Sequence, residues 1–237
     1  MKPLLRSFGL FLRQILKDSM LVMVCFAVLL AAFFFRFGIP AVEHLLCGSL
    51  GKERILADYY LLFDLMLALI TPYMLCFASA LMMLTEYDDN LTEYLAVTPV
   101  GKRGYIISRL VFPTVIAFMV SVLLMLGFTL TTWSFGMILA TCALCCLVSV
   151  SIALLLFAFS HNRVEGMAMA KLSGLLMFGL FVPFFLFSNV QYLFSPLPSF
   201  WIAKLCTDQN PFYILPALFC VSIWILFLYR KFNRKIL

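Results

Sequence analysis

Long apolar runs dominate the chain, and polar residues are confined to the short segments between them. A helix needs about 20 apolar residues to cross the hydrocarbon core of a bilayer, and six runs qualify as candidate spans. They cover residues 19–35, 59–85, 110–130, 135–159, 172–188 and 212–229. The third and fourth runs are separated only by a short turn at residues 131–134, so they are predicted to form a helical hairpin. The pattern predicts an all-α integral membrane protein with six transmembrane helices.

The first 18 residues follow a different, amphipathic pattern. At about 100° per residue, cations share one face of a helix and bulky apolar side chains the other. The cations are Lys2, Arg6, Arg13 and Lys17, and the apolar residues are Leu4, Phe8, Phe11 and Ile15. Such a helix lies in the interface of an anionic leaflet, as a simple anchor or as an elbow that also borders a cytoplasmic partner. We therefore predict an interfacial elbow helix over 1–18 and a transmembrane domain over 19–237.

Composition excludes the soluble classes of protein. Hydrophobic residues make up 65% of the chain and charged residues 12%, whereas globular domains have about 45–50% and about 25%. A domain of this size cannot bury so much apolar surface, because its exterior still needs polar cover. Soluble enzymes, disordered tails and disulfide scaffolds are therefore excluded.

The formal net charge of +6 is distributed unevenly between the two sides of the predicted bundle. With six spans both termini lie on one side, which receives 13 Lys and Arg residues, and the other side receives four. Lys and Arg concentrate in cytoplasmic segments of membrane proteins. Both termini are therefore predicted to be cytoplasmic, and the basic excess points to membrane lipid rather than nucleic acid.

Six of the eight cysteines fall within predicted spans, where Cys behaves as a small apolar residue. The cluster Cys142-x-x-Cys145-Cys146 resembles a metal motif, but no His or carboxylate lies near it in the span. Helix packing is therefore favoured, and no metal site is expected. Cys47 and Cys206 are both predicted outside, where a disulfide between them is an open alternative.

Asp64 is the one clear ionisable residue inside a predicted span. A charge at the bilayer centre costs about 2.5–3.5 kcal/mol on insertion scales, so this carboxylate is expected to face the bundle or water. Its position near the external end of the span leaves two interpretations open. It lines a transport pathway, or it is an interfacial carboxylate.

The loop after the second span carries an acidic pattern. On a helix, Glu86, Asp89, Asn90 and Glu93 share one face, and Thr98-Pro99 ends the helix. An acidic stripe at an anionic leaflet would be accounted for by a basic protein partner. A solvated loop helix is the alternative.

Two other connecting segments carry local signals. Residues 160–172 form a short polar turn in which Glu165-Gly166 opens the next helix. Residues 189–212 are semi-apolar, aromatic and interrupted by prolines, which suits an interfacial or re-entrant hairpin on the external side. Its candidate interface anchors are Tyr192 and Trp201.

Glu86 to Val100, EYDDNLTEYLAVTPV, resembles the signature of ABC-2 type permeases, a run of the form E-x-[ED]-[ED]-G-T-L-E-x-L-x-V-T-P-V. The matching residues are Glu86, Asp88, Asp89, Glu93, Leu95, Val97, Thr98, Pro99 and Val100. The Val164–Lys171 turn and the Gln191–Lys204 stretch are similar to the fluoroquinolone-export branch of that family. Asn90 and Leu91 depart from the usual Gly-Thr, which puts the shape of the helix start in question.

The resemblance implies the membrane-spanning permease subunit of an ATP-binding-cassette exporter in a bacterial cell membrane. Its substrate would be drug-like, peptide or lipid-like. Two copies of a separate ATPase subunit would bind ATP and Mg, this chain would bind no cofactor, and a second permease copy or paralogue would complete the complex. By resemblance, the helix that couples to the ATPase contains Glu86, Asp88, Asp89, Glu93, Leu95, Thr98 and Pro99. The second cytoplasmic turn contains Glu165, Gly166 and Lys171, and the external hairpin contains Tyr192, Pro196, Pro198 and Trp201.

The sequence contains no motif for catalysis by this chain. No P-loop occurs, since Gly51-Lys52 is followed by Glu53 and Gly101-Lys102 by Arg103. Neither H-E-x-x-H nor G-x-S-x-G is present, and both histidines lie outside the predicted spans. The chain is therefore not expected to be an enzyme. A non-transporting membrane partner, such as an immunity or sensory subunit, remains the alternative function.

Overall fold

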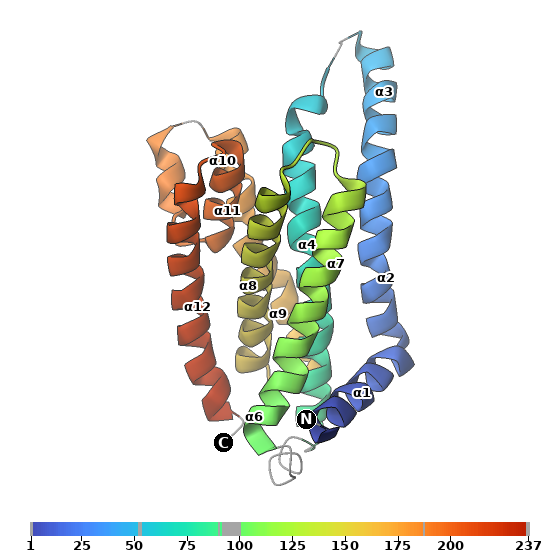
Figure 1. Ribbon diagram of the computed structural model, residues 1–237, viewed down its shortest axis with the longest axis vertical. Helices are drawn as coiled ribbons and strands as arrows, with labels where there is room; N and C mark the ends of the chain where they lie inside the picture. Colours follow the sequence, from blue (N-terminus) through green and yellow to red (C-terminus); the bar gives the residue numbers. More distant parts are fainter. Residues whose placement is uncertain (1, 52–53, 90, 92–100, 187, 236–237) are drawn as a thin grey trace.

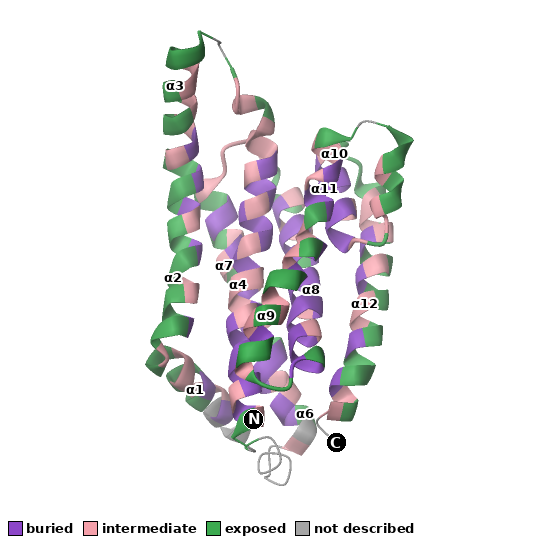
Figure 2. Ribbon diagram, turned by 180° about the vertical axis from the view of Figure 1, so that it is seen from behind, coloured by how far each residue is buried: buried purple, intermediate pink, exposed green. Residues whose placement is uncertain are grey.

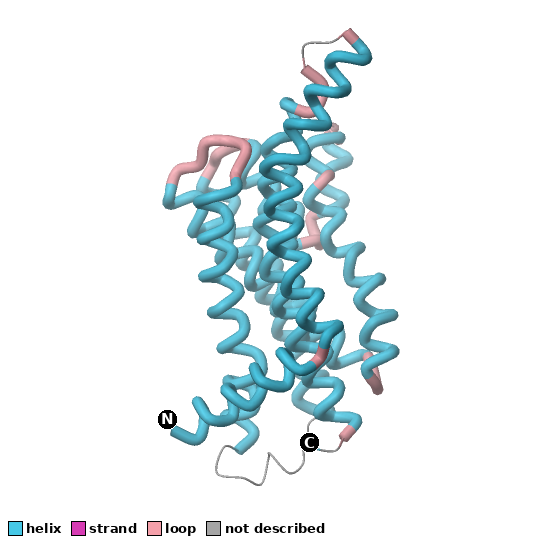
Figure 3. The backbone as a smooth tube through the Cα atoms, turned by 90° about the vertical axis from the view of Figure 1, so that its right-hand side faces the viewer, coloured by secondary structure: helices cyan, strands magenta, loops and turns pink. Residues whose placement is uncertain are grey.

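The computed structural model describes residues 2–51, 54–89, 91, 101–186 and 188–235, of which 2–6 and 102 are described by their backbone alone. Every regular element in these ranges is helical, as predicted. Five helices are long and apolar enough to cross a membrane. They cover Ser19–Leu50, Ala57–Asp88, Arg103–Phe128, Phe135–Phe159 and Pro211–Lys235. They form a bundle with both chain termini at the same end (Figures 1 and 3).

Two helices, α4 (Tyr60–Asp88) and α8 (Phe135–Phe159), form the centre of the bundle. Figure 2 shows that buried residues concentrate on them, whereas the flanking helices carry broad exposed faces. The flanking helices are α2 (Ser19–Phe33), α7 (Phe112–Phe128) and α12 (Ile214–Lys235). Helix α8 is apolar on all sides, which is the composition expected of a helix surrounded by others.

The first predicted span is longer than its apolar run indicated. Helix α2 continues through the π-turn η1 (Phe34–Gly38) into α3 (Ile39–Leu50) instead of ending at residue 35. Figure 1 shows α3 extending beyond the other helices. Arg36, which closed the predicted span, donates to the carbonyl of Thr129 just after the end of α7. A cation is favourable there, because the last carbonyls of a helix lack partners of their own.

Pro72 lies in the middle of α4 without ending it. Proline has no N–H, so the carbonyl of Ala68, four residues earlier, loses its usual helical donor. The hydroxyl of Ser121 on α7 lies 3.3 Å from that carbonyl oxygen and donates to it. A neighbouring helix thus satisfies a backbone group that could not remain unpaired in a lipid environment.

The same compensation recurs where the third span begins. The π-helical turn η3 (Ile107–Val111) connects α6 (Gly101–Ile106) to α7, and Pro113 follows it. Pro113 cannot donate to the carbonyl of Arg109, and the hydroxyl of Ser79 on α4 donates to it instead. The paired serines and prolines therefore fix α4 against α7 at two levels.

The prediction of one continuous helix over 172–188 is wrong. That segment belongs to three pieces: α9 (Arg163–Ser173), the 3₁₀-helix η4 (Gly174–Leu180) and α10 (Val182–Phe185). Together they run from the end of the bundle that holds the termini to the opposite end (Figures 1 and 2). The apolar composition of this segment correctly indicated that the chain runs from one end of the bundle to the other. It did not indicate that the helix is interrupted.

Close packing explains the irregular middle piece. A Cβ atom on Gly179 would lie 2.5 Å from Ser199 Oγ and 2.7 Å from the Phe200 backbone nitrogen. Only glycine allows this approach, and the hydroxyl of Ser199 donates to the carbonyl of Leu176 in η4. The close contact with Ser199 and Phe200 thus accompanies a 3₁₀-helix in place of a regular α-helix.

That neighbour is the predicted hairpin over 189–212. It consists of η5 (Asn189–Phe194), α11 (Pro198–Thr207) and η6 (Pro211–Tyr213) before α12. Helix α11 is buried from Pro198 to Cys206 apart from the half-buried Trp201, so it is inserted into the bundle and does not lie on its surface.

The cysteines of α8 pack inside the protein. Cys142 and Cys145 belong to the main hydrophobic core, and Ser121 Oγ lies 3.4 Å from Cys142 Sγ. Cys206 is a buried thiol whose sulfur lies 3.4 Å from Thr141 Oγ1. The structure therefore does not contain the alternative Cys47–Cys206 disulfide.

The predicted amphipathic helix is present as α1 (Lys2–Lys17), inclined to the bundle axis at the end with the termini (Figure 1). Phe11 is fully buried, and Phe8 and Ile15 pack against the same core. Arg13 and Lys17 are exposed. Among the residues whose side chains are described, the predicted apolar residues thus face the bundle, and the interfacial position of the helix stays a prediction.

Candidate functional site

The end of α4 carries a buried ion pair. The carboxylate of Glu86 accepts hydrogen bonds from Arg109 Nε at 3.1 and 3.0 Å and from Arg109 Nη2 at 2.6 Å. Glu86 is 1% exposed and Arg109 3% exposed. This two-nitrogen geometry is the strong form of an arginine–carboxylate pair.

The burial of Glu86 corrects the prediction of a continuous acidic face. Asp89 is exposed, but Glu86 faces into the protein. Positions three apart differ by about 60° around a helix, and that is enough to separate a packed face from a solvated one. On the Glu86 side, α1 and η3 cover α4.

Arg109 also binds α1. Its Nη1 donates to the carbonyl of Ser7 at 2.9 Å and lies 3.0 Å from the Ser7 hydroxyl. The guanidinium carbon lies 4.8 Å from the ring centre of Phe11 and 5.7 Å from that of Tyr105. One side chain therefore connects α4, η3 and the amphipathic helix.

This connection is costly to disturb. Both charges have left water, and the desolvation of each is offset only while the other stays in place. Removing one partner from a buried pair typically costs about 3–5 kcal/mol. The three elements consequently hold a fixed relative position or rearrange together.

A second connection joins the same end of α4 to α9 and to the start of α2. Asp88 Oδ2 accepts from the backbone N–H of Arg163 at 3.1 Å. Arg163 Nη1 lies 2.6 Å from Asp18 Oδ2, and Asp18 also caps α2 by accepting from the N–H of Met20. The hydrogen bond from Arg163 holds the pKa of the Asp18 carboxyl below its usual value of 3.8.

The predicted second cytoplasmic turn lies beside these residues. Asn162 caps α9 by accepting from the N–H of Glu165 at 2.8 Å, and Glu165 accepts from the N–H of His161 at 2.6 Å. A Cβ atom on Gly166 would lie 2.4 Å from Leu84 Cδ1, so this glycine allows α9 to pack against α4. Glu165 and Gly166 thus have structural roles, and Lys171 is exposed.

The remaining predicted coupling residues fall in one segment. Glu93, Leu95, Thr98 and Pro99 lie outside the described residues. The described chain on either side of them ends at α4 and resumes at α6, both of which reach the end of the bundle that holds the termini (Figure 1). The acidic segment is therefore flanked by elements that Glu86, Arg109 and Asp88 bind to the rest of the molecule.

Asp64 lies at the opposite end of α4 and is 1% exposed. Its carboxylate accepts from the N–H of Leu130 at 2.7 Å, from the N–H of Thr131 at 2.9 Å and from Trp133 Nε1 at 3.0 Å. The hydroxyl of Thr131 is a fourth donor. These donors all belong to the turn between α7 and α8, so the carboxylate holds that turn. A role for Asp64 in the pathway stays a prediction.

Side chains of α11 and α12 hold the predicted hairpin over 189–212. Trp201 Nε1 donates to the carbonyl of Ser195 at 2.8 Å, and Trp224 Nε1 donates to the carbonyl of Pro196 at 3.0 Å. Pro198 begins α11. The buried ammonium nitrogen of Lys204 lies over the ring of Tyr192, 4.8 Å from the ring centre. The four predicted hairpin residues are therefore brought together on one small unit.

Three residues of these sites, Arg109, Ser7 and Lys204, are not singled out by the sequence pattern. In the sequence pattern Arg109 is one of the predicted cytoplasmic charges, and Lys204 is one of the predicted external charges and the last residue of the Gln191–Lys204 motif. Lys204 lines a cavity of about 450 Å³ near η5 and α10, together with Asp58, Tyr59 and Asp208 among others. The signal available was the rarity of Lys and Arg next to apolar runs.

Comparison with known proteins adds an independent finding. Residues 11–229 match the family described as fluoroquinolones export permease protein Rv2686c-like. Two Mycobacterium tuberculosis proteins are similar over nearly their whole length: the fluoroquinolones export permease proteins Rv2686c of strain H37Rv and MT2760 of strain CDC 1551. Each is 28% identical over 240 residues, which cover 94% of this chain and 91% of the relative. No solved structure matches the chain.

Proposed function

The chain belongs to the Rv2686c-like family of fluoroquinolones export permease proteins, and from this premise we propose that it is the membrane subunit of an ATP-driven exporter. Family membership and five apolar helices make it a multi-pass membrane protein and a transport subunit. The proposal adds that ATP and Mg are bound by two separate ATPase subunits, because the sequence has no P-loop. It also adds a second permease, six crossings and cytoplasmic termini.

The arrangement at the end of α4 is the observation that supports this proposal most. An ATPase subunit docked on residues 86–100 would push or pull directly on α4 and α6. The Glu86–Arg109–Ser7 contacts would pass that movement to α1 and α7. The Asp88–Arg163–Asp18 contacts would pass it to α9 and α2. Closure of the ATPase subunits would thereby change access to the pathway between permeases.

Because Glu86 is buried, the docking test must avoid it. We propose the double variant Asp89→Lys/Glu93→Lys, which reverses the charge of the exposed Asp89 and of the predicted coupling residue Glu93. The matched control is Asp58→Lys/Asp208→Lys, which makes the same charge change on exposed residues at the opposite end. The readout is co-purification of the ATPase subunit with the full permease.

The docking proposal expects the first variant to lose the ATPase subunit and the control to retain it. Equal retention by both variants would contradict docking on this segment. Purified complex in proteoliposomes then tests the function itself. Export that requires ATP supports the proposal, and a cellular phenotype that persists without the ATPase subunit would favour the non-transporting alternative.

We further propose that the substrate is an amphipathic aromatic compound of the fluoroquinolone kind, as the names of the relatives indicate. The cavity at Lys204 is within the size range of about 300–1,000 Å³ typical of small-molecule sites. It offers one cation, two carboxylates and the ring of Tyr59. An aromatic acid leaving the bundle would pair with Lys204.

The substrate proposal is tested with Lys204→Met, with Lys171→Met as the control at the opposite end. A charge-assisted hydrogen bond is worth about 1.5 kcal/mol or more, so the transport KM for a fluoroquinolone should rise about tenfold in the first variant. The control should keep the native KM. An unchanged KM in Lys204→Met would exclude this cavity from the path.

A further inference from the structure

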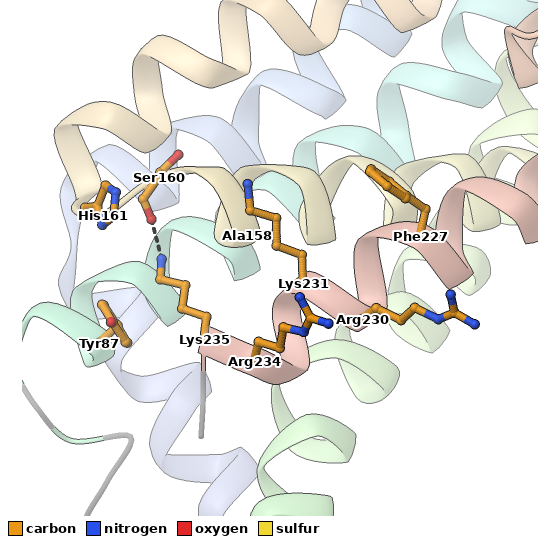
Figure 4. A pocket seen from close by; sticks show the side chains of 9 residues that line it. All are labelled: Tyr87, Ala158, Ser160, His161, Phe227, Arg230, Lys231, Arg234 and Lys235. Carbon is orange, nitrogen blue, oxygen red and sulfur yellow. Dashed lines mark hydrogen bonds between the residues drawn. The ribbon is translucent and has the colours of Figure 1, made fainter.

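The last turns of α12 form a strongly basic cavity with the end of α8. The cavity has a volume of about 580 Å³. It is lined by Tyr87, Ala158, Ser160, His161, Phe227, Arg230, Lys231, Arg234 and Lys235. Four of these side chains are cations and none is a carboxylate, so the cavity favours an anion. Figure 4 shows Lys231 and Lys235 reaching from α12 towards the end of α8.

The two lysines are already engaged by the protein. Lys235 Nζ donates to the carbonyl of Phe157 at 2.7 Å and to the carbonyl of Ser160. Lys231 Nζ lies 3.3 Å from the ring centre of Phe159. The two hydrogen bonds from Lys235 satisfy carbonyls at the end of α8, where the helix supplies no donor. The lysines therefore fasten α12 to α8 and form one wall of the cavity.

The two arginines are available for a ligand. Arg230 and Arg234 are exposed, and within the described part of the chain neither makes a hydrogen bond or an ion pair. Ser160, whose buried hydroxyl has no hydrogen-bond partner among the described residues, also lines the cavity, next to Lys235 (Figure 4). Guanidinium groups bind phosphate oxygens through two parallel hydrogen bonds, which makes a phosphate group the natural match.

The surroundings of the cavity select a lipid as the carrier of that phosphate. Phe227 lines the cavity and is also 63% exposed, on the same helix as the exposed Phe219, Ile223 and Leu226. The apolar outer face of α12 therefore continues into the basic cavity without a break. An amphiphile would place acyl chains along this face and its head group at the arginines.

We propose that this cavity is a binding site for an anionic phospholipid, whose phosphodiester pairs with Arg230 and Arg234. The site goes beyond the export function, because lipid binding here requires neither an ATPase nor a substrate. Bound lipid would cover the charge at the junction of α12 with α8 and stabilise their contact.

The test uses the full chain purified in detergent and titrated with phosphatidylglycerol, with binding counted by native mass spectrometry. Each basic residue near an anionic lipid contributes about 1 kcal/mol, so Arg230→Gln/Arg234→Gln should bind about 30-fold more weakly. The control Arg103→Gln/Lys171→Gln removes the same charge from exposed positions that neither line the cavity nor belong to helix α1, and it should lose less than about threefold. Phosphatidylcholine should not compete with phosphatidylglycerol. Equal melting temperatures without added lipid would establish that both variants are folded.

Several results would overturn the site. If both double variants bound phosphatidylglycerol equally weakly, the loss would reflect the overall charge of the protein and not this cavity. Equal binding of phosphatidylcholine would show that the head-group charge is not read. Displacement of the lipid by millimolar inorganic phosphate would assign the cavity to free phosphate instead. Loss of the ATPase subunit from Arg230→Gln/Arg234→Gln with unchanged lipid binding would assign it to a protein partner.

Discussion

Helix α4 holds a buried carboxylate at each end, and the two are satisfied in opposite ways. Asp64 accepts hydrogen bonds from uncharged donors, all of which belong to residues 130–133. Glu86 is paired with the charge of Arg109, which also binds Ser7 on α1. The first carboxylate closes one turn between two helices that follow each other in sequence. The second joins three elements that are distant in sequence.

Under the proposed function, the difference indicates which end of α4 passes movement to other elements. A carboxylate held by one tight turn has a single arrangement, since its donors cannot separate from each other. A charge shared among α1, η3 and α4 can keep its partners only if these elements move together. Under the proposed function, the end of α4 that carries Glu86 is therefore the end where force from the ATPase subunit would be transmitted. The Asp64 end is the fixed reference.

The largest effect should come from breaking the pair at Glu86. Arg109→Met leaves the carboxylate buried without a cation, and we expect a loss of about 3–5 kcal/mol in the free energy of unfolding. The measurement is denaturant-induced unfolding of the full chain in mixed micelles. The matched variant Glu86→Leu/Arg109→Met removes both charges and should recover most of that stability.

The double variant also tests the comparison itself. If the pair only stabilises the fold, the recovered protein should transport normally. If it passes movement between α1 and α4, transport should stay low although stability has returned. Normal transport by a stable Glu86→Leu/Arg109→Met protein would remove the functional distinction between the two ends of α4.

The next largest effect should come from the opposite end. Asp64→Asn replaces one carboxylate oxygen, which accepts hydrogen bonds, by an NH₂ group. This group can only donate, and it would face the N–H and O–H donors of the turn. We expect a loss of about 2 kcal/mol, because hydrogen bonds to charged groups are worth about 1.5–3 kcal/mol each. The measurement is the same unfolding titration, accompanied by transport. Stability should fall while the transport that remains per folded molecule is unchanged; a specific loss of transport would instead restore the pathway interpretation of Asp64.

A smaller loss of stability is expected from a packing change at the Glu86 end of α4. Gly166→Ala places a methyl group 2.4 Å from Leu84 Cδ1, in the contact between α9 and α4. Overpacking costs about 1–3 kcal/mol, and we expect about 1.5 kcal/mol because a leucine methyl can shift. The control is Gly174→Ala just after α9, where a Cβ atom meets nothing within 4 Å. Equal stability of the two variants would mean that α9 is not firmly packed against α4.

The sequence predicted the helices well where the deciding property was local. Apolar runs located the five long helices, and charge periodicity located α1, because both patterns can be read within one turn or one span. The hairpin between α7 and α8 followed from the short polar turn between two runs. No partner from elsewhere in the chain was needed for these predictions.

The predictions failed where a partner distant in the sequence decides the outcome. Gly179 permits a 3₁₀-helix because Ser199 and Phe200 pack against it, and nothing near Gly179 reveals them. Likewise, Glu86 and Asp89 look equivalent on a helical wheel. Only the position of Arg109, across the segment of residues 90–100, distinguishes the buried carboxylate from the exposed one. Spacing along one helix cannot show which of its faces is covered.

The smallest effect concerns the half-buried pair at the same end, Asp18 with Arg163. Asp18→Asn keeps the side-chain oxygen that caps α2 and removes only the charge, so the loss should be about 0.5 kcal/mol. The pKa of Asp18 is lowered in the folded protein, so its contribution is present above the ordinary value of 3.8 and disappears as the pH falls through the lower folded value. Unfolding titrations of native protein and Asp18→Asn should therefore differ at pH 6 and converge below pH 3.8. A difference that persists at lower pH would mean that the effect of the substitution does not come from the charge of Asp18 and its pairing with Arg163. Among the described residues at this end, the charge pair that stabilises the fold would then be Glu86 with Arg109.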